Sequence, residues 1–226
     1  MKATEYENYI IKKPWGSEYI IFKNDKLTIT YLDIKYLEKT SLHCHPTKKT
    51  GLIVVSGSAE ITLGFYNSET FNAPAKTMIR PGFFHSTQAI SKNGVKIIEI
   101  ETPSNKEDIV RFMDNYGREG KKYIANSKKS KIKNKIIFKN PEFGKTKSYF
   151  FDGVELKIEK YKNLKKIINK PLDTIIAVID GGIRCKKTKK LVLSPGEVVK
   201  VGTIIKLDSF FEINEYISII SISRSN

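Results

Sequence analysis

Residues 41–64 read SLHCHPTKKTGLIVVSGSAEITLG and contain two of the chain's three histidines, His43 and His45. Side chains alternate along a β-strand, so a strand over residues 42–45 would point both imidazoles to one face and Cys44 to the other. Two imidazoles on one face can act together as ligands of a metal ion. This stretch therefore predicts a strand that carries two ligands of a metal site.

The third histidine, His85, follows a turn signal at Pro81-Gly82. Such a turn could bring a later strand beside the first and complete a three-nitrogen site. The alternative is that the three histidines are unrelated polar side chains, which is the usual interpretation when a histidine stands alone. A His-x-His pair with one further histidine after a turn favours a metal, so we predict one divalent ion on His43, His45 and His85. Imidazole accepts Zn, Fe, Mn or Ni, and the sequence does not choose among them.

Hydrophobic periodicity along the chain is mostly of period two, which is typical of half-buried strands. Ile61 and Leu63 alternate with polar residues, as Leu156 and Ile158 do. Turn signals separate the apolar runs, and one of them is Asp180-Gly181-Gly182. Many short strands with frequent turns predict an all-β sandwich or barrel. The further predicted strands are Glu18–Phe22, Leu27–Tyr36, Leu52–Val55, Thr77–Arg80, Val95–Glu101, Thr174–Ile179 and Ile217–Ser223.

A polar, charge-rich segment at Arg118–Lys139 favours a linker, although a solvated face would have the same composition. We place the boundary within it and predict two domains, 1–127 and 128–226. Gly-containing turns of the first half have counterparts at different spacings in the second, a weak sign of an internal repeat. The second domain holds no histidine. It is therefore predicted to be metal-free, with a role in packing or in an oligomer contact.

The net charge of +16 arises from 40 basic and 24 acidic residues. Residues 1–120 contribute +2 and residues 121–226 contribute +14. A basic surface can bind nucleic acid, but 35 of the 40 basic residues are Lys, whereas base readout favours Arg. We therefore predict no nucleic-acid partner.

The predicted location of the protein in the cell follows from features that the sequence lacks. No apolar run approaches the ~20 residues of a membrane span. The first residues lack the apolar region of a secretory signal. Two cysteines, Cys44 and Cys185, are not a disulfide framework. These features predict a cytoplasmic protein with no membrane span.

Segments 41–64 and 77–88 resemble the two motifs of the cupin superfamily, a His-x-His with a downstream glycine and then a turn followed by a histidine. The chain is most similar to the cupin domain of type II mannose-6-phosphate isomerases, which also ends bifunctional isomerase/mannose-1-phosphate guanylyltransferases. The resemblance implies a cupin β-barrel and, with the weak repeat, a second, degenerate barrel in tandem. The stretches that carry it are KPWGSE (13–18), LIVVSGSAE (52–60) and DIVRFMDNYGR (108–118).

The chain departs from the family pattern at Thr50, seven positions before Gly57, where cupins of this kind carry a glutamate metal ligand. Lys48 and Lys49 precede it, so this segment brings positive charge where the family has an anion. A metal held by three histidines would keep its full +2 charge, with water or Thr50 filling other positions. Three-histidine sites without the carboxylate also resemble those of thiol and diketone dioxygenases on the cupin fold.

Isomerisation of an aldose to a ketose needs a base that moves a proton and an electrophile that stabilises the enediolate oxygen. Glu99 and Glu101 share one face of the predicted strand Val95–Glu101. If that face lines the barrel, one of them is the candidate base. If it is a solvated edge, neither is.

The remaining candidate residues would contact a substrate. Arg111 and Arg118 stand in the segment that resembles the family's Arg-bearing tail, and the resemblance implies that Arg118 acts at the sugar or its phosphate. Guanidinium suits bidentate phosphate recognition. Lys13 and Trp15 resemble the family's first segment, although Trp15 is equally compatible with a core position. Thr50 completes the set of candidate substrate-binding residues.

Three hypotheses follow. The first is a metal-dependent sugar-phosphate isomerase or epimerase in carbohydrate or surface-polysaccharide precursor metabolism, with a phosphorylated sugar or nucleotide sugar as substrate. The second is a non-catalytic sugar-binding or regulatory cupin. The third is a three-histidine metal dioxygenase or lyase. The resemblance also implies a homodimer, because cupins commonly pair.

Overall fold

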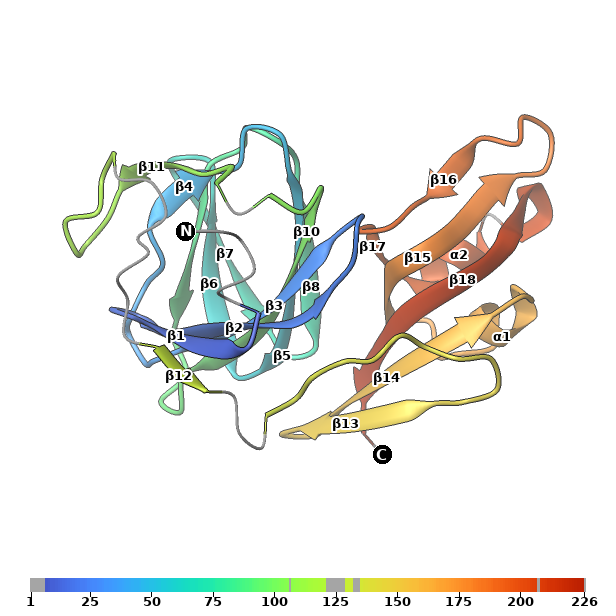
Figure 1. Ribbon diagram of the computed structural model, residues 1–226, viewed down its shortest axis with the longest axis horizontal. Helices are drawn as coiled ribbons and strands as arrows, with labels where there is room; N and C mark the ends of the chain where they lie inside the picture. Colours follow the sequence, from blue (N-terminus) through green and yellow to red (C-terminus); the bar gives the residue numbers. More distant parts are fainter. Residues whose placement is uncertain (1–6, 106, 121–128, 132–134, 207, 226) are drawn as a thin grey trace. The chain divides into compact units, whose positions relative to one another are not determined.

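The computed structural model describes residues 7–105, 107–120, 129–131, 135–206 and 208–225 (Figure 1). The chain divides into two compact units, Met1–Ile137 (unit 1) and Phe138–Asn226 (unit 2). The predicted boundary at residues 127 and 128 lies outside the described residues. In the described part of the chain, no helix is both long and apolar enough to cross a membrane.

The described residues of unit 1 form two antiparallel β-sheets. One sheet has seven strands in the order β12-β1-β2-β3-β10-β5-β8, and the other has five in the order β11-β4-β9-β6-β7 (Figure 1). Strands distant in sequence are neighbours in both sheets, and the predicted all-β fold of this unit is confirmed. The strands are β1 (Tyr9–Lys13), β2 (Gly16–Lys23), β3 (Thr28–Ile34), β4 (Leu42–Cys44), β5 (Lys49–Ser56), β6 (Ser58–Leu63), β7 (Asn67–Asn72), β8 (Ala75–Ile79), β9 (His85–Ala89), β10 (Val95–Thr102), β11 (Val110–Met113) and β12 (Lys129–Lys131).

The apolar core of unit 1 joins the two sheets. Ile34, Val54 and Ile97 from the seven-stranded sheet form one buried cluster with Ala59 and Ile61 from the five-stranded sheet. All five are 0% exposed. Full burial of a Val or Ile side chain contributes about 1.5–3 kcal/mol. In β6, Ala59 and Ile61 enter this core while Ser58 and Glu60 stay half-buried, whereas β3 and β5 are buried along almost their whole length.

Unit 2 has one six-stranded antiparallel sheet in its described residues, in the order β13-β14-β18-β15-β16 with β17 paired to β15. Two short helices pack on one face of this sheet, where unit 1 has a second sheet, because Ile167 and Ile204 join the cluster of Val178 and Ile219. That unit 2 is a degenerate barrel stays a prediction. Its elements are β13 (Lys147–Phe151), β14 (Val154–Tyr161), α1 (Lys165–Ile168), β15 (Ile175–Cys185), β16 (Leu191–Leu193), β17 (Val198–Lys200), α2 (Val201–Ile205), η2 (Asp208–Phe210) and β18 (Phe211–Arg224).

The predicted turn at Asp180-Gly181-Gly182 is wrong, because these residues lie inside β15. The pairing of β15 with β18 shifts register between Val178 and Asp180 and again between Gly181 and Ile183. Gly181 has a φ of +66°, and a Cβ added there would lie 2.1 Å from the carbonyl oxygen of Tyr216. The glycines therefore form a bulge that bends one long strand.

Candidate metal centre and adjoining pocket

The structure brings together the three histidines that the sequence singles out. His43 on β4 is the register partner of His85 on β9, and His45 follows directly after β4. Their candidate ligand nitrogens all lie within 4.8 Å of one another. The ring centroids are 4.4 to 5.5 Å apart. The three side chains are buried, so the cluster is a compact three-nitrogen group that could hold a metal ion.

The Pro81-Gly82 turn positions one of these strands against the other. Gly82 has a φ of +73°, which glycine adopts readily. Its N–H donates to the carbonyl oxygen of His45 at 2.8 Å. This bond ties the turn before β9 to the end of β4, and so holds His85 beside His45.

Hydrogen bonds on the far side of each ring fix which nitrogen faces the centre. A backbone carbonyl only accepts, so each Nδ1 must carry the proton and each Nε2 keeps its lone pair. Within the described part of the chain, the buried Nε2 of His85 has no hydrogen-bond partner. Bonds of this kind orient metal-ligating histidines in proteins. In this chain the three hydrogen bonds run from His43 Nδ1 to Ser41 O (2.8 Å), from His45 Nδ1 to Asp108 O (2.6 Å) and from His85 Nδ1 to Phe83 O (3.1 Å).

Burial keeps the three imidazoles uncharged near neutral pH. Desolvation is the main cause in each case, and it lowers the pKa of His43 well below 6.5 and that of His85 to about 4. The pKa of His45 is also lowered by burial, against the opposing effect of Glu101. The uncharged imidazole is the form that binds a metal. The cluster is therefore ready to accept a cation.

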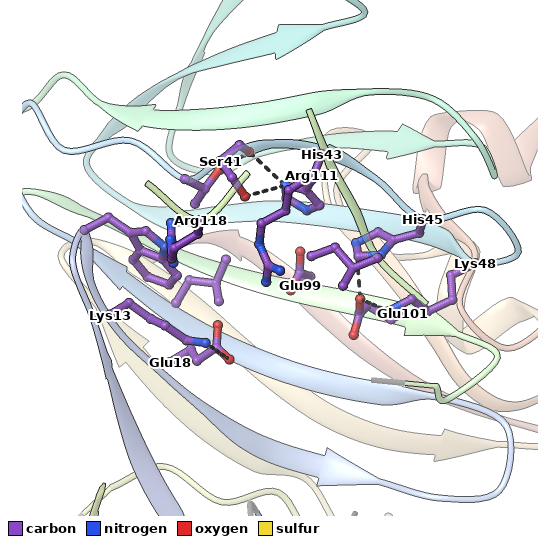
Figure 2. Close-up of a pocket in the computed structure, with 14 residues that line it drawn as sticks. Lys13, Glu18, Ser41, His43, His45, Lys48, Glu99, Glu101, Arg111 and Arg118 are labelled. Atoms are coloured by element: carbon purple, nitrogen blue, oxygen red, sulfur yellow. Dashed lines mark hydrogen bonds and ion pairs between the residues drawn. The ribbon is translucent and has the colours of Figure 1, made fainter. Parts of the chain in front are cut away.

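Two carboxylates reach the same centre from the opposite sheet (Figure 2). Glu99 and Glu101 on β10 form a second potential ligand group with His45, again within 4.8 Å. Glu101 is 4% exposed, and its Oε1 lies 3.4 Å from His45 Nε2. The same oxygen accepts a hydrogen bond from Lys48 Nζ at 2.5 Å. This face of β10 lines a pocket and is no solvated edge.

The pocket has a volume of about 590 Å³, including its open mouth. Most of the predicted site residues line it together. Thr50 and His85, which are 1% and 2% exposed, are not among the lining residues. Trp15 lines the pocket and also belongs to the core cluster, so its position is compatible with both predictions. The lining comprises Lys13, Trp15, Glu18, Leu32, Thr40, Ser41, His43, His45, Lys48, Glu99, Glu101, Ile109, Arg111 and Arg118.

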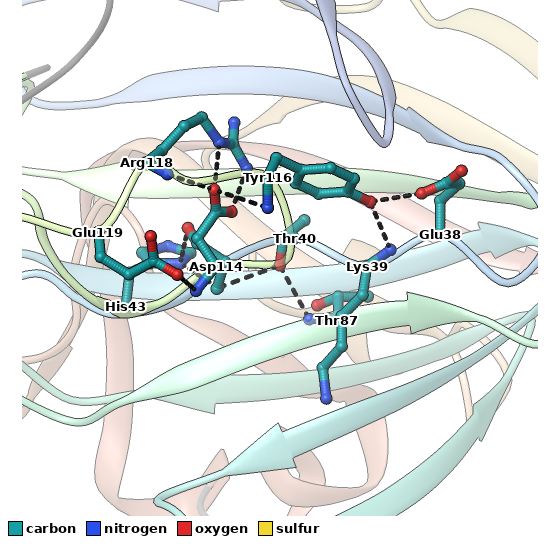
Figure 3. A network of polar contacts seen from close by, with 10 residues as sticks. Glu38, Lys39, Thr40, His43, Thr87, Asp114, Tyr116, Arg118 and Glu119 are labelled. Atoms are coloured by element: carbon teal, nitrogen blue, oxygen red, sulfur yellow. Dashed lines mark hydrogen bonds and ion pairs between the residues drawn. The ribbon is translucent and has the colours of Figure 1, made fainter. Parts of the chain in front are cut away.

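A polar network orients Arg118 at this pocket (Figure 3). Asp114, whose side chain is fully buried, accepts from Arg118 Nε at 2.8 Å and from Arg118 Nη2 at 2.6 Å. Hydrogen bonding to Arg118 lowers the pKa of Asp114 against the opposing effect of burial. The Arg118 guanidinium also lies over the Tyr116 ring, whose hydroxyl donates to Glu38. Lys13 pairs with Glu18 at 3.3 Å.

Sequence reasoning missed Asp114 as the residue that orients Arg118 and Lys48 as the partner of Glu101. The four-residue spacing of Asp114 and Arg118 was a signal available for the first. The second has no local signal, because its partners are 53 residues apart.

Residues 2–114, half of the chain, match the family described as Mannose-6-phosphate isomerase C-terminal. The alginate biosynthesis protein AlgA of Pseudomonas putida is 30% identical over 118 residues, 51% of this chain and 24% of AlgA. The xanthan biosynthesis protein XanB of Xanthomonas campestris is 31% identical over 110 residues, 48% of this chain and 23% of XanB. The match thus spans about a quarter of the length of either relative.

An RmlC-like cupin from Shewanella frigidimarina is similar in structure, with a TM-score of 0.40 and 15% identity over 47% of this chain and 91% of that one. The predicted resemblance is confirmed by the match over residues 2–114. The chain belongs to the mannose-6-phosphate isomerase C-terminal family of cupin domains.

Proposed function

We propose that unit 1 is a metal-dependent sugar-phosphate isomerase or epimerase of the mannose-6-phosphate isomerase type. The observation that carries this proposal is the cluster of three histidines, two of which, His43 and His45, line a pocket that also holds carboxylates and cations. The names of AlgA and XanB link these relatives to polysaccharide biosynthesis. A phosphorylated sugar or nucleotide sugar is therefore the substrate class that we propose.

The residues present suit a divalent metal ion. His43, His45 and His85 would hold it through Nε2, and imidazole accepts Zn, Fe, Mn or Ni. When bound, such an ion acts as a Lewis acid that stabilises negative charge on a substrate oxygen. The His85 Nε2 atom, buried and without a hydrogen-bond partner within the described residues, supports a cation at this point.

Glu99 is the base that we propose. Glu101 is paired with Lys48 and lies beside His45, which is the position of a metal ligand. Isomerisation also needs a carboxylate that can take a proton from one sugar carbon and return it to the next. Glu99 lines the same pocket, two residues along β10. Both glutamates stay candidates for catalysis, and the variants below separate them.

Cations at the pocket suit the phosphate of the substrate. Lys13, Arg111 and Arg118 all line it. A guanidinium has five N–H donors, and Asp114 accepts from two of those of Arg118. Arg118 is thus held in one orientation with donors to spare, a suitable arrangement for bidentate phosphate binding.

A coupled assay of mannose 6-phosphate isomerisation by the metal-loaded full chain tests the proposal. We expect turnover that falls about 10²- to 10⁴-fold in Glu99→Gln, the usual effect of losing a general base. His43→Ala should lose the metal. Glu69→Gln, at an exposed position of β7, is the matched control and should leave turnover unchanged. Failure to turn over any sugar phosphate in a broad panel would refute the isomerase.

A non-catalytic sugar-binding or regulatory cupin is the second candidate. The position of Lys48 favours this second candidate, because the buried ammonium of Lys48 donates a hydrogen bond to Glu101, one of the carboxylates of the pocket. Thermal shift with sugar phosphates and nucleotide sugars would separate the two, since a ligand of the native state raises apparent stability even without turnover. Unit 2, which lacks histidine, would then serve packing or a homodimer contact.

A further inference from the structure

The register of the seven-stranded sheet places Glu101 opposite Thr50. Glu101 on β10 pairs directly with Thr50 on β5. Side chains of directly paired residues lie on the same face of a sheet, about 4.5–5.5 Å apart at Cβ. Thr50 stands at the position where the resembled family has its glutamate ligand, and the neighbouring strand supplies a carboxylate to the same space. The Oε1 atom of Glu101 lies 3.4 Å from His45 Nε2.

Lys48 balances this carboxylate. Its side chain is 2% exposed and that of Glu101 is 6% exposed, and Lys48 Nζ lies 2.5 Å from Glu101 Oε1. A buried charge without a partner is costly, so each of the two requires the other or a replacement for it. The oxygen that faces His45 is the one that Lys48 holds. An ammonium and a divalent ion would compete for it, because two cations at such short range repel.

We propose that Glu101 is the carboxylate ligand of the metal centre and that Lys48 is its counter-ion in the metal-free protein. The proposal rests on the metal centre of the proposed function, which it extends by a fourth ligand and an internal competitor. Metal binding displaces the ammonium from Glu101. The affinity for a divalent ion is then set by the strength of the Lys48–Glu101 pair as well as by the three histidines.

Titration of the metal-free full chain with Co²⁺ against a chelator tests this, with the ligand-field absorption of Co²⁺ as a second readout of its coordination. We expect Lys48→Met to bind Co²⁺ at least about tenfold more tightly than the wild type and Glu101→Gln at least about tenfold more weakly. Lys49→Met, the neighbouring lysine, and Glu69→Gln, at an exposed position of β7, are the matched controls and should leave the affinity unchanged.

Two double variants keep the test independent of folding defects. Lys48→Met/Glu101→Gln, compared with Lys48→Met, removes the carboxylate without leaving a buried lysine unpaired, and should again lose at least about tenfold. Thr50→Glu/Glu101→Gln moves the carboxylate to the paired position and should recover most of the affinity. Circular dichroism confirms that each variant is folded.

The outcomes separate this proposal from the metal centre itself. Equal Co²⁺ affinity with and without Glu101, in both the wild-type and Lys48→Met backgrounds, would overturn the ligand role of Glu101 while leaving the three-histidine site intact. An unchanged Co²⁺ affinity in Lys48→Met would overturn the role of Lys48 as the counter-ion of Glu101. A folded wild type and a folded Lys48→Met that both fail to bind Co²⁺ would overturn the metal centre, and this proposal with it.

Discussion

Asp108 joins two chain segments at the metal centre, and its loss should loosen both. Its carbonyl oxygen accepts from His45 Nδ1 at 2.6 Å, while its carboxylate accepts from the backbone N–H of Lys48 at 3.0 Å and of Thr47 at 3.1 Å. Asp108→Ala leaves the Lys48 N–H buried and unpaired. A hydrogen bond to a charged group contributes about 1.5–3 kcal/mol, and the more exposed Thr47 bond adds less, so we expect a loss of about 3 kcal/mol.

Thermal and urea denaturation of the metal-free chain would measure this loss, which corresponds to a decrease in Tm of about 10 °C for a unit of this size. Co²⁺ affinity should fall about 10- to 100-fold, because the segment that carries His45 is no longer fixed. Asp108→Asn keeps one acceptor oxygen and should lose only about 1 kcal/mol. Wild-type stability and affinity in Asp108→Ala would show that this carboxylate does not hold the segment, and would refute the reasoning.

Three further predictions concern pH, the pocket and unit 2. Burial lowers the pKa of His85 to about 4 from 6.5, so the metal-free chain should lose stability as the pH falls from about 6.5 towards 4, by up to about 3 kcal/mol, and His85→Gln should flatten this profile in urea titrations. Asp114→Asn releases Arg118 from a fixed orientation and should raise the KM for a sugar phosphate about tenfold with a smaller change in kcat; an unchanged KM would contradict the role of Arg118. Gly181→Ala places a Cβ 2.1 Å from a backbone oxygen and should destabilise unit 2 by about 2–4 kcal/mol, as monitored by hydrogen exchange, while exchange in unit 1 stays unchanged.

The local sequence pattern was sufficient to predict the histidine cluster but not the charged residues beside it. The strand alternation at His43 and His45 and the turn before His85 are encoded within a few residues, so the cluster could be predicted. Lys48 and Glu101 meet only because β5 and β10 are adjacent, and no local signal specifies that adjacency.

The bulge in β15 shows the same limit. Asp180-Gly181-Gly182 has the local composition of a turn, but β15 pairs with β18 on both sides of it. Tyr216 on β18 donates through its hydroxyl to Asp180 at 2.7 Å. Cross-strand bonds over 36 residues therefore decide between a turn and a bulge, and a turn signal alone carries no information about them.

The lysine surplus of the sequence hides one lysine that differs from the others. The net charge of +16 describes the chain as a whole, and composition gives no reason to treat any lysine separately. Yet Lys48 is 2% exposed and pairs with Glu101 beside three uncharged imidazoles. Since two paired positions of one sheet face can each project a carboxylate into the same space, a barrel can lose a ligand at position 50 and keep the charge at position 101. The lysine that neutralises this carboxylate then makes the metal-free site stable, and Co²⁺ affinity in Lys48→Met measures how strongly it competes.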